Sequence, residues 1–364
     1  MASTDVTFAP VHFADLPHWA DDDHGAAFAA FLVSSRRLLE RARDGLTPTS
    51  PEPLLRVARI AVDSSGTITS RDDARVFFED HFTPHRVLHS EMKGMLTGYY
   101  EPLIAGSRAQ TDRFAVPVLR RPADLVNLVS ESERGAKAEA LTHARKTATG
   151  TEPYATREDI ETGALAGQGL ELVWLEDVVD AFFLHVQGSG LIAFADGTTA
   201  RITYDGKNGH PYTSVGRYLI DAGLFPADQM SLQALKDWLR VDAARGIAAM
   251  RQNKSYVFFR ELTGEAARSA LGAMEIPLSD HRSLAVDTRF HALGTPVYVV
   301  STALMHAGRD DGFYRLMVAQ DVGSAIRGPE RGDIYFGTGD EAGRRAGITK
   351  HPGNFFVLVP EAVP

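Results

Sequence analysis

Two aspartates near the C-terminus, Asp321 and Asp333, lie in a glycine-rich frame flanked by apolar segments. The apolar segment Tyr314–Gln320 ends at Asp321, and Asp333 begins a second segment that contains Tyr335 and Phe336. Carboxyl groups at strand ends tend to point into a cleft. Burial there disfavours the charged carboxylate and raises its pKa, as an acid catalyst requires. The pattern therefore predicts an acid–base site at these two side chains.

A third aspartate, Asp287, also follows an apolar segment. An aspartate beside glycines is first a turn residue, but three strand-end aspartates in one β-rich region are harder to attribute to turns. Asp287 with Thr288, and Asp321–Gly323, partly match the Asp-Thr/Ser-Gly signature of aspartic proteases. Arg289 stands where that class requires glycine, and a cation there favours full ionisation over a shared proton. An aspartic protease is therefore the weaker interpretation.

Other motifs point away from cofactors. Gly337–Gly343 is close to a dinucleotide fingerprint, but its spacing is wrong and Asp340 and Glu341 would repel a pyrophosphate. The run Asp21–His24 is interpreted as a solvated, helix-starting loop, so we expect no required metal ion. No Gly-x-Ser-x-Gly elbow is present, which disfavours a serine nucleophile. We expect an enzyme without metal or cofactor.

Composition narrows the class of protein further. The chain has 364 residues, 44% of them hydrophobic, which is typical of a globular protein of two domains. A formal charge of -9 argues against nucleic acid or anionic lipid as a partner. Cysteine is absent, which excludes disulfides and thiol nucleophiles. The sequence has neither a long apolar run nor a signal-like start.

Patterning predicts a mainly β protein with helices, in the α+β class. Helical periodicity covers Ala26–Ala42 and Arg71–Phe82, with a proline-rich break at Pro48–Pro53 between them. Short β segments follow, including Ala181–Val186, expected as the first strand of a meander. From residue 283 onward many short strands with few helices indicate a barrel. Aromatic residues beside polar donors, notably Tyr99 and Tyr335, could line a groove in which sugar faces stack.

Six motifs occur in order along the chain: Thr97–Pro102, Val186–Gly190, Tyr204–His210, Ser255–Phe259, Ala285–Asp287 and Asp321–Gly323 through Asp333–Gly343. Together these motifs resemble the membrane-bound lytic transglycosylase A family. The resemblance spans roughly residues 90 to 364, while the first ninety residues carry no motif that we can match. Six separate motifs in sequence order are far more specific than any one of them.

The resemblance implies a fold and an activity. The expected fold is a double-psi β-barrel formed by residues 1–103 and 265–364, with a smaller β-barrel inserted as residues 104–264 and a groove between the two. The expected reaction cuts the β-1,4 bond between N-acetylmuramic acid and N-acetylglucosamine in peptidoglycan and leaves a 1,6-anhydromuramoyl end. Water takes no part in that reaction. A non-catalytic cell-wall glycan-binding protein and a hydrolysing muramidase remain open as alternatives.

The resemblance also implies roles for individual residues. Asp333 aligns with the family's single acid–base aspartate, while the remaining family positions would contact substrate. Family members are exported, so we expect a periplasmic protein, with outer-membrane association and cell-wall enzyme complexes left open. The lipid-bearing cysteine of many relatives is missing, which argues against a membrane anchor on this sequence. The expected substrate-binding residues are Asp321, Asp287, Tyr99, Thr97, Gln187 and Tyr335.

Overall fold

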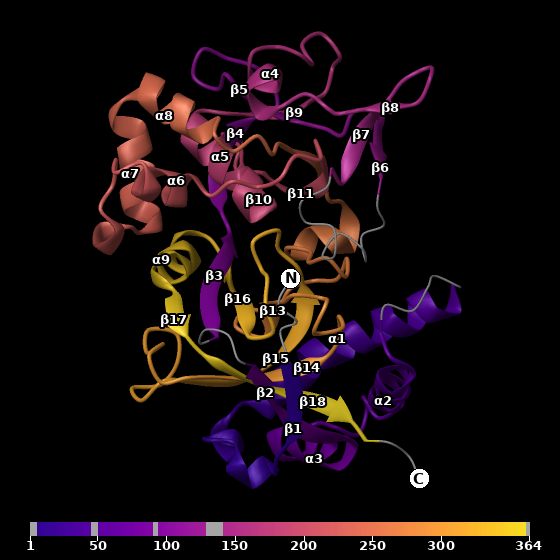
Figure 1. Ribbon diagram of the computed structural model, residues 1–364. Coiled ribbons are helices and arrows are strands. Elements are labelled where there is room, and N and C mark those ends of the chain that lie inside the picture. The colour runs from indigo at the N-terminus through magenta and orange to yellow at the C-terminus, as the bar shows by residue number, and fades with distance from the viewer. Residues whose placement is uncertain (1–5, 45–49, 90–93, 129–140, 362–364) are drawn as a thin grey trace. The chain divides into compact units, whose positions relative to one another are not determined.

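The computed structural model describes residues 6–44, 50–89, 94–128 and 141–361. The architecture is mixed α+β and mostly sheet, which confirms the predicted class. The chain divides into two compact units (Figure 1), and each is described by itself. Unit 1 comprises Met1–Tyr99, Leu271–Gly337 and Thr349–Pro364; unit 2 comprises Tyr100–Ala270 and Thr338–Ile348. Among the described residues, no helix combines the length and apolarity that a membrane crossing requires.

Unit 1 is built on a nine-stranded sheet. Most neighbouring strands are antiparallel, but the short central strand β13 runs parallel to β15 and antiparallel to β16. The described pairings leave β1 and β17 as the two edges, so these pairings do not close a barrel. In spatial order the strands are β1 (Val6–Pro10), β2 (Phe82–His89), β18 (Asn354–Pro360), β14 (Pro296–Ser301), β15 (Phe313–Asp321), β13 (Ser283–Ala285), β16 (Arg331–Thr338), β3 (Met95–Glu101) and β17 (Lys350–Pro352).

Three helices of unit 1 share one hydrophobic core with the sheet. Helices α1 (His24–Arg43) and α3 (Arg71–His81) confirm the two predicted helical segments. Helix α2 (Glu52–Asp63) was not predicted, because Pro51 and Pro53 were interpreted as a break. Both prolines lie at its start, where their missing N–H groups are not needed. The shared core includes Phe31, Phe78, Tyr298, Leu316 and Leu358, all fully buried.

The start of α1 corrects one expectation from the sequence. The segment Asp21–His24, expected as a solvated loop, contains two buried side chains, Asp22 and His24. Asp22 accepts hydrogen bonds from both terminal nitrogens of Arg282, at 2.8 and 2.9 Å, and from the backbone N–H of Leu316 at 2.7 Å. The run of aspartates suggested a solvent-exposed segment, but Arg282, far away in the sequence, compensates the charge of the buried Asp22 carboxylate.

Unit 2 contains a six-stranded and a three-stranded sheet. The core of the larger sheet is formed by apolar side chains such as Val173, Ile192, Ile202 and Phe259. In spatial order its strands are β12 (Val257–Glu261), β11 (Thr199–Lys207), β10 (Ser189–Ala193), β4 (Leu103–Ser107), β9 (Glu171–Leu175) and β5 (Val116–Leu119). The smaller sheet holds β6 (Leu125–Asn127), β7 (His143–Lys146) and β8 (Thr151–Glu152).

The helices of unit 2 differ from the prediction at one point. Ala181–Val186, expected as a strand, lies inside helix α5 (Val178–Gln187). The side chain of Asp177 caps its start by accepting from the N–H of Val179 at 2.6 Å, and Gly188 ends it in the left-handed region. The other helices are α4 (Arg157–Glu161), α6 (Val215–Asp221), α7 (Leu232–Val241), α8 (Ala243–Met250) and α9 (Asp340–Ile348).

A buried ion pair joins distant segments of unit 2. Glu101 is fully buried and Arg201 is 9% exposed. The guanidinium of Arg201 donates to both carboxylate oxygens of Glu101, at 2.8 and 3.0 Å, and to the backbone oxygen of Ala267. The hydroxyl of Thr338 donates to the same carboxylate at 2.7 Å. The network therefore holds together strands β3 and β11 and the segments around residues 267 and 338.

Replacing Arg201 by Leu should destabilise the protein by about 3–5 kcal/mol, because the carboxylate of Glu101 would remain buried without its partner. Urea denaturation followed by tryptophan fluorescence measures the change. Arg217→Leu is the matched control, since Arg217 and its partner Asp221 are both well exposed and their loss should change little. Equal effects of the two substitutions would show that burial of the Glu101 pair is unimportant.

Candidate active site

The register of the central strands brings Asp321 and Asp333 to one row of the sheet. Ala285 on β13 pairs with Asp321 on β15, just after a shift of register between Leu284 and Ala285, and on its other side with Asp333 on β16. Directly paired residues project from the same face of a sheet, and the two outer strands are roughly 10 Å apart at the backbone. The small side chain between the two aspartates leaves room for their carboxyl groups. The predicted pair is therefore brought together by β13.

Strand β3 supplies two further members of the predicted set. It lies beside β16 (Figure 1), and the hydroxyl of Thr97 donates a hydrogen bond to Oδ1 of Asp333. The phenol of Tyr99 donates to Oδ2 of Asp321 at 2.9 Å. The rings of Tyr99 and Tyr335 are in contact, with centroids 5.2 Å apart. The structure thus gathers five of the seven predicted site residues in unit 1.

The carboxylate of Asp321 is held by three donors. Its Oδ1 accepts from the backbone N–H groups of Ala273, at 2.8 Å, and Val322, at 2.9 Å, while Tyr99 occupies Oδ2. Burial nevertheless raises the pKa of Asp321 to about 6, and the nearby charge of Asp333 adds to the increase. The hydrogen bonds act in the opposite direction but do not outweigh burial. Asp321 therefore titrates close to neutral pH.

Asp333 has a different set of contacts. Burial raises the pKa of Asp333, while the Thr97 hydrogen bond and the positive charge of Arg331 oppose the increase. Its Oδ2 accepts no hydrogen bond from any residue that the structure describes. Repulsion between the carboxylates of Asp321 and Asp333 makes it unfavourable for both to ionise. The two groups therefore titrate as a coupled pair. Asp333 therefore combines a raised pKa with one unoccupied oxygen.

Asp287 lies in unit 1 but in a different electrostatic setting. Its carboxylate is fully buried, and burial alone would raise its pKa. The guanidinium of Arg289, 2.5 Å away, and the backbone N–H of Gly328, at 2.8 Å, hold the pKa of Asp287 below its usual value instead. Asp287 therefore remains ionised and is unsuited to donate a proton, in agreement with the ionising effect expected of Arg289.

Gln187 is the one predicted site residue in unit 2. It is the last residue of α5, and its side-chain oxygen accepts a hydrogen bond from the backbone N–H of Tyr100 at 3.2 Å. The amide is thus oriented by the end of β3. Its proposed contact with substrate stays a prediction.

The described residues contain no group of three histidine, aspartate or glutamate side chains that could hold a metal ion. His81, His85 and His89 recur every four residues, the spacing of helical metal ligands. This repeat was not singled out from the sequence. The first of these histidines ends α3 and the other two lie on β2, where residues four apart are roughly 13 Å from each other, so this spacing does not gather the three rings around one ion.

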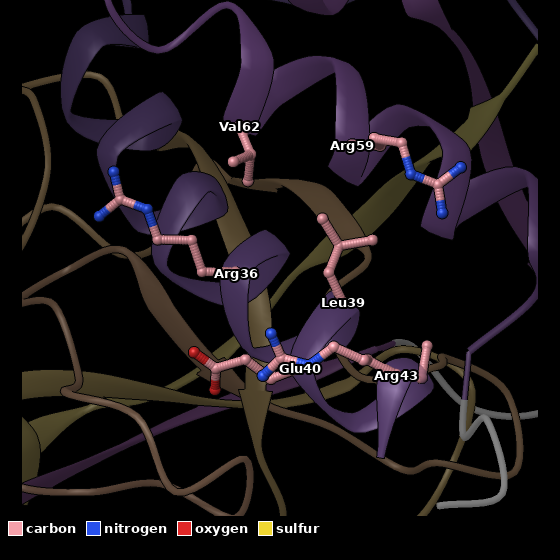
Figure 2. A pocket seen from close by; sticks show the side chains of 7 residues that line it. Arg36, Leu39, Glu40, Arg43, Arg59 and Val62 are labelled. Carbon is pink, nitrogen blue, oxygen red and sulfur yellow. The ribbon is translucent and has the colours of Figure 1, made fainter. Parts of the chain in front are cut away.

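A cavity of about 520 Å³ lies elsewhere in unit 1, between α1 and α2 (Figure 2). None of the predicted site residues lines it. Three arginines contribute to its lining, and all three side chains are exposed to solvent. The lining residues are Arg36, Leu39, Glu40, Ala42, Arg43, Arg59 and Val62.

Sequence reasoning missed two residues that act on the aspartates. Arg331 influences the pKa of Asp333, and Ala273 donates its N–H to Asp321. Arg331 could have been found, because residues two apart on a strand share a face and Asp333 begins an aromatic strand. Ala273 could not, since it contributes only its backbone.

Asp321→Asn should remove a pH dependence of stability. The folded-state pKa of Asp321, about 6, lies above the ordinary 3.8, so its stabilising contribution is present at low pH and is lost as pH rises through 6. Between about pH 4 and pH 8, the free energy of unfolding of the variant should rise by on the order of 2–3 kcal/mol relative to that of wild type. Urea denaturation at several pH values measures this difference.

Asp287→Asn is the control for this experiment. The pKa of Asp287 is lowered, so its stabilisation is complete above the ordinary pKa and is lost only in more acidic solution. The difference in free energy of unfolding between Asp287→Asn and wild type should therefore stay constant over the same pH range. A flat difference for Asp321→Asn as well would contradict the raised pKa of Asp321.

The chain is similar to known proteins in both sequence and fold. Residues 95–260 match the family model of the MltA specific insert domain, and residues 282–359 match the 3D domain model. The crystal structure of a membrane-bound lytic murein transglycosylase from Agrobacterium tumefaciens has a TM-score of 0.86 at 33% identity, covering 97% of this chain and 98% of that one. Escherichia coli MltA with bound chitohexaose has a TM-score of 0.68 at 28% identity, covering 100% of this chain and 94% of that one.

The chain is also similar in sequence to curated proteins of the same family. Membrane-bound lytic murein transglycosylase A of Escherichia coli K12 is 35% identical over 266 residues, which is 72% of this chain and 64% of the relative. The Vibrio cholerae protein of the same name is 39% identical over 213 residues, 57% of each chain. The chain thus spans less than two thirds of the length of these curated relatives. Sequence and structure together place this chain in the membrane-bound lytic murein transglycosylase A family.

Proposed function

We propose that this protein is a lytic transglycosylase of peptidoglycan in which Asp333 is the single acid–base residue. The substrate is the glycan strand, and the bond cut is the β-1,4 bond between N-acetylmuramic acid and N-acetylglucosamine. The observation that carries the proposal is the half-buried Asp333, whose pKa is raised by desolvation and whose Oδ2 has no hydrogen-bond partner among the described residues. Family membership supplies the substrate class.

One carboxyl is sufficient for this reaction because the nucleophile belongs to the substrate. Asp333 gives its proton to the glycosidic oxygen as the bond from that oxygen to C1 of muramic acid breaks. The C6 hydroxyl of the same sugar bonds to C1, and its proton passes to the carboxylate of Asp333. The acid is thereby restored, and no water is consumed. Ordinary glycosidases need a second carboxyl, which the intramolecular hydroxyl replaces here.

The other site residues hold this arrangement in place. Asp321 orients Tyr99, whose ring contacts Tyr335, and the two tyrosines offer an aromatic surface on which a sugar face can stack. Thr97 orients Asp333, and in this proposal Gln187 contacts a more distant part of the glycan, while the fully buried Asp287 can act on substrate only through its partners Arg289 and Gly328. Asp287 stays ionised and so acts only as a hydrogen-bond acceptor.

The finer fold and the location belong to the same proposal. Unit 1 corresponds to a double-psi β-barrel, supported by the parallel pairing of β13 with β15 within an otherwise largely antiparallel sheet. Unit 2 corresponds to the inserted smaller β-barrel, supported by the match of residues 95–260 to the insert-domain model. Peptidoglycan as substrate implies a periplasmic protein that works beside other cell-wall enzymes.

Asp333→Asn should abolish release of anhydromuropeptides from purified sacculi, because an amide cannot donate the required proton. Cosedimentation with sacculi should persist, since the amide keeps the shape of the carboxyl. Asp310→Asn, at an exposed loop position, is the control and should retain full activity. Turnover by Asp333→Asn would refute its role. A wild-type protein that sediments with the wall without releasing fragments would be a glycan-binding protein instead.

Mass spectrometry of the products separates transglycosylation from hydrolysis. Intramolecular attack by the C6 hydroxyl leaves anhydro ends, which lack the mass of one water relative to the hydrolysis product. We expect only anhydro products, whether the sacculi are digested in ordinary water or in water enriched in ¹⁸O, and no incorporated label. Reducing ends that carry the label would identify a hydrolysing muramidase.

A further inference from the structure

Arg331 lies on the same face of β16 as Asp333, two residues before it. Its Nη2 donates to the hydroxyl oxygen of Thr97 at 2.8 Å. Its Nη1 donates to the backbone oxygen of Gly332 at 2.6 Å and approaches that of Met95 at 3.4 Å. The guanidinium is therefore held between β16 and β3, and it reaches Asp333 through one intervening hydroxyl.

The chemistry of the groups sets the direction of this hydrogen-bond chain. A guanidinium has donors only, so the oxygen of Thr97 must accept from Arg331. A threonine hydroxyl has a single hydrogen, and Thr97 uses it to donate to Oδ1 of Asp333. Without Arg331 the hydroxyl could rotate and accept a hydrogen bond from the protonated carboxyl group instead. With Arg331 in place, Oδ1 is the accepting oxygen and Oδ2 is left for the proton.

We propose that Arg331 is a positioning residue for the acid–base step: through Thr97 it keeps Oδ1 of Asp333 as an acceptor and leaves Oδ2 as the oxygen that delivers and recovers the proton. The proposal rests on the function proposed above for Asp333. It assigns a role to a side chain outside the expected site, and it predicts that Thr97 acts mainly as a link between the two charged groups.

The charge of Arg331 has a second effect on the same carboxyl. Burial raises the pKa of Asp333 and the positive charge of Arg331 opposes the rise, so loss of the charge should raise that pKa further. Among the described residues, other charged or titratable groups on this part of the sheet include Asp321 on β15, Tyr99 on β3, Tyr335 on β16 and the exposed Lys350 on β17, which pairs with Thr97. None of them is altered by a substitution at Arg331.

The first test compares Arg331→Met and Arg331→Lys with wild type. In Arg331→Met we expect kcat to fall about tenfold with little change in KM, because the proton is no longer confined to Oδ2. Activity requires protonated Asp333, so the limb of the pH profile that falls at high pH should move upward by about one unit. Arg331→Lys keeps the charge and should restore the position of that limb. Arg309→Met removes an exposed arginine of the same unit and should change neither quantity.

A double-mutant cycle tests whether Arg331 acts through Thr97. Thr97→Val removes the hydroxyl at nearly constant volume, and Thr97→Ser retains it and should restore activity. If the chain of contacts is correct, adding Arg331→Met to Thr97→Val should lower kcat by less than twofold further. If the losses in kcat caused by the two substitutions multiply in the double variant, the proposal is wrong. It is also wrong if Arg331→Met folds stably and the high-pH limb of its pH profile does not move.

A direct titration separates this proposal from the proposed function. Carbon-13 NMR of carboxyl-labelled aspartate follows the ionisation of Asp333 without substrate, with Asp333→Asn used to assign its signal. An upward shift of that titration in Arg331→Met supports the positioning role even if wild type releases no anhydro products. Normal activity in wild type with an unchanged titration in Arg331→Met would overturn the positioning role and leave the proposed function standing.

Discussion

The pairing of β13 with β15 and β16 at the same time is the constraint on which the candidate site depends. Ala285 is the residue that meets Asp321 on one side and Asp333 on the other. Because cross-strand partners share a face, a slip of either outer strand by one residue would turn its aspartate to the opposite face. The short strand is fully buried, with backbone hydrogen bonds on both edges, which fixes the register. A row of backbone hydrogen bonds thus determines where two ionisable groups meet.

Three aspartates that look alike in the sequence have different environments in the folded chain. Asp287 faces an arginine and a backbone N–H group, which outweigh the cost of burial and keep it charged. Asp321 accepts three hydrogen bonds, yet burial and the nearby Asp333 raise its pKa. Asp333 receives one hydrogen bond, from a hydroxyl that is itself held by Arg331. The balance between desolvation and compensating partners, and not residue type, separates the charged acceptor from the candidate proton donor.

Local patterns predicted some elements well and failed at others for identifiable reasons. Helices α1 and α3 follow from apolar periodicity and from capping side chains at Asp23 and Ser70. Helix α5 was mistaken for a strand because its apolar run is buried on most sides and shows no clear period. The prolines at the start of α2 indicated a break, although the first turn of a helix tolerates them. The first ninety residues carried no recognisable motif, yet the Agrobacterium tumefaciens structure covers 97% of the chain.

The sequence by itself determined the family, the α+β class and the aspartates, threonine and tyrosines gathered in unit 1, because ordered motifs and strand-end carboxyls are local features. Only the tertiary structure decided which partner each carboxyl has. The contacts of Asp321 with Ala273 and of Asp333 with Thr97 join segments far apart in the chain. A pKa depends on burial and on charges brought close by folding, and neither quantity is encoded in the neighbouring residues. The importance of Arg331 follows for the same reason, since its partner Thr97 lies on a different strand.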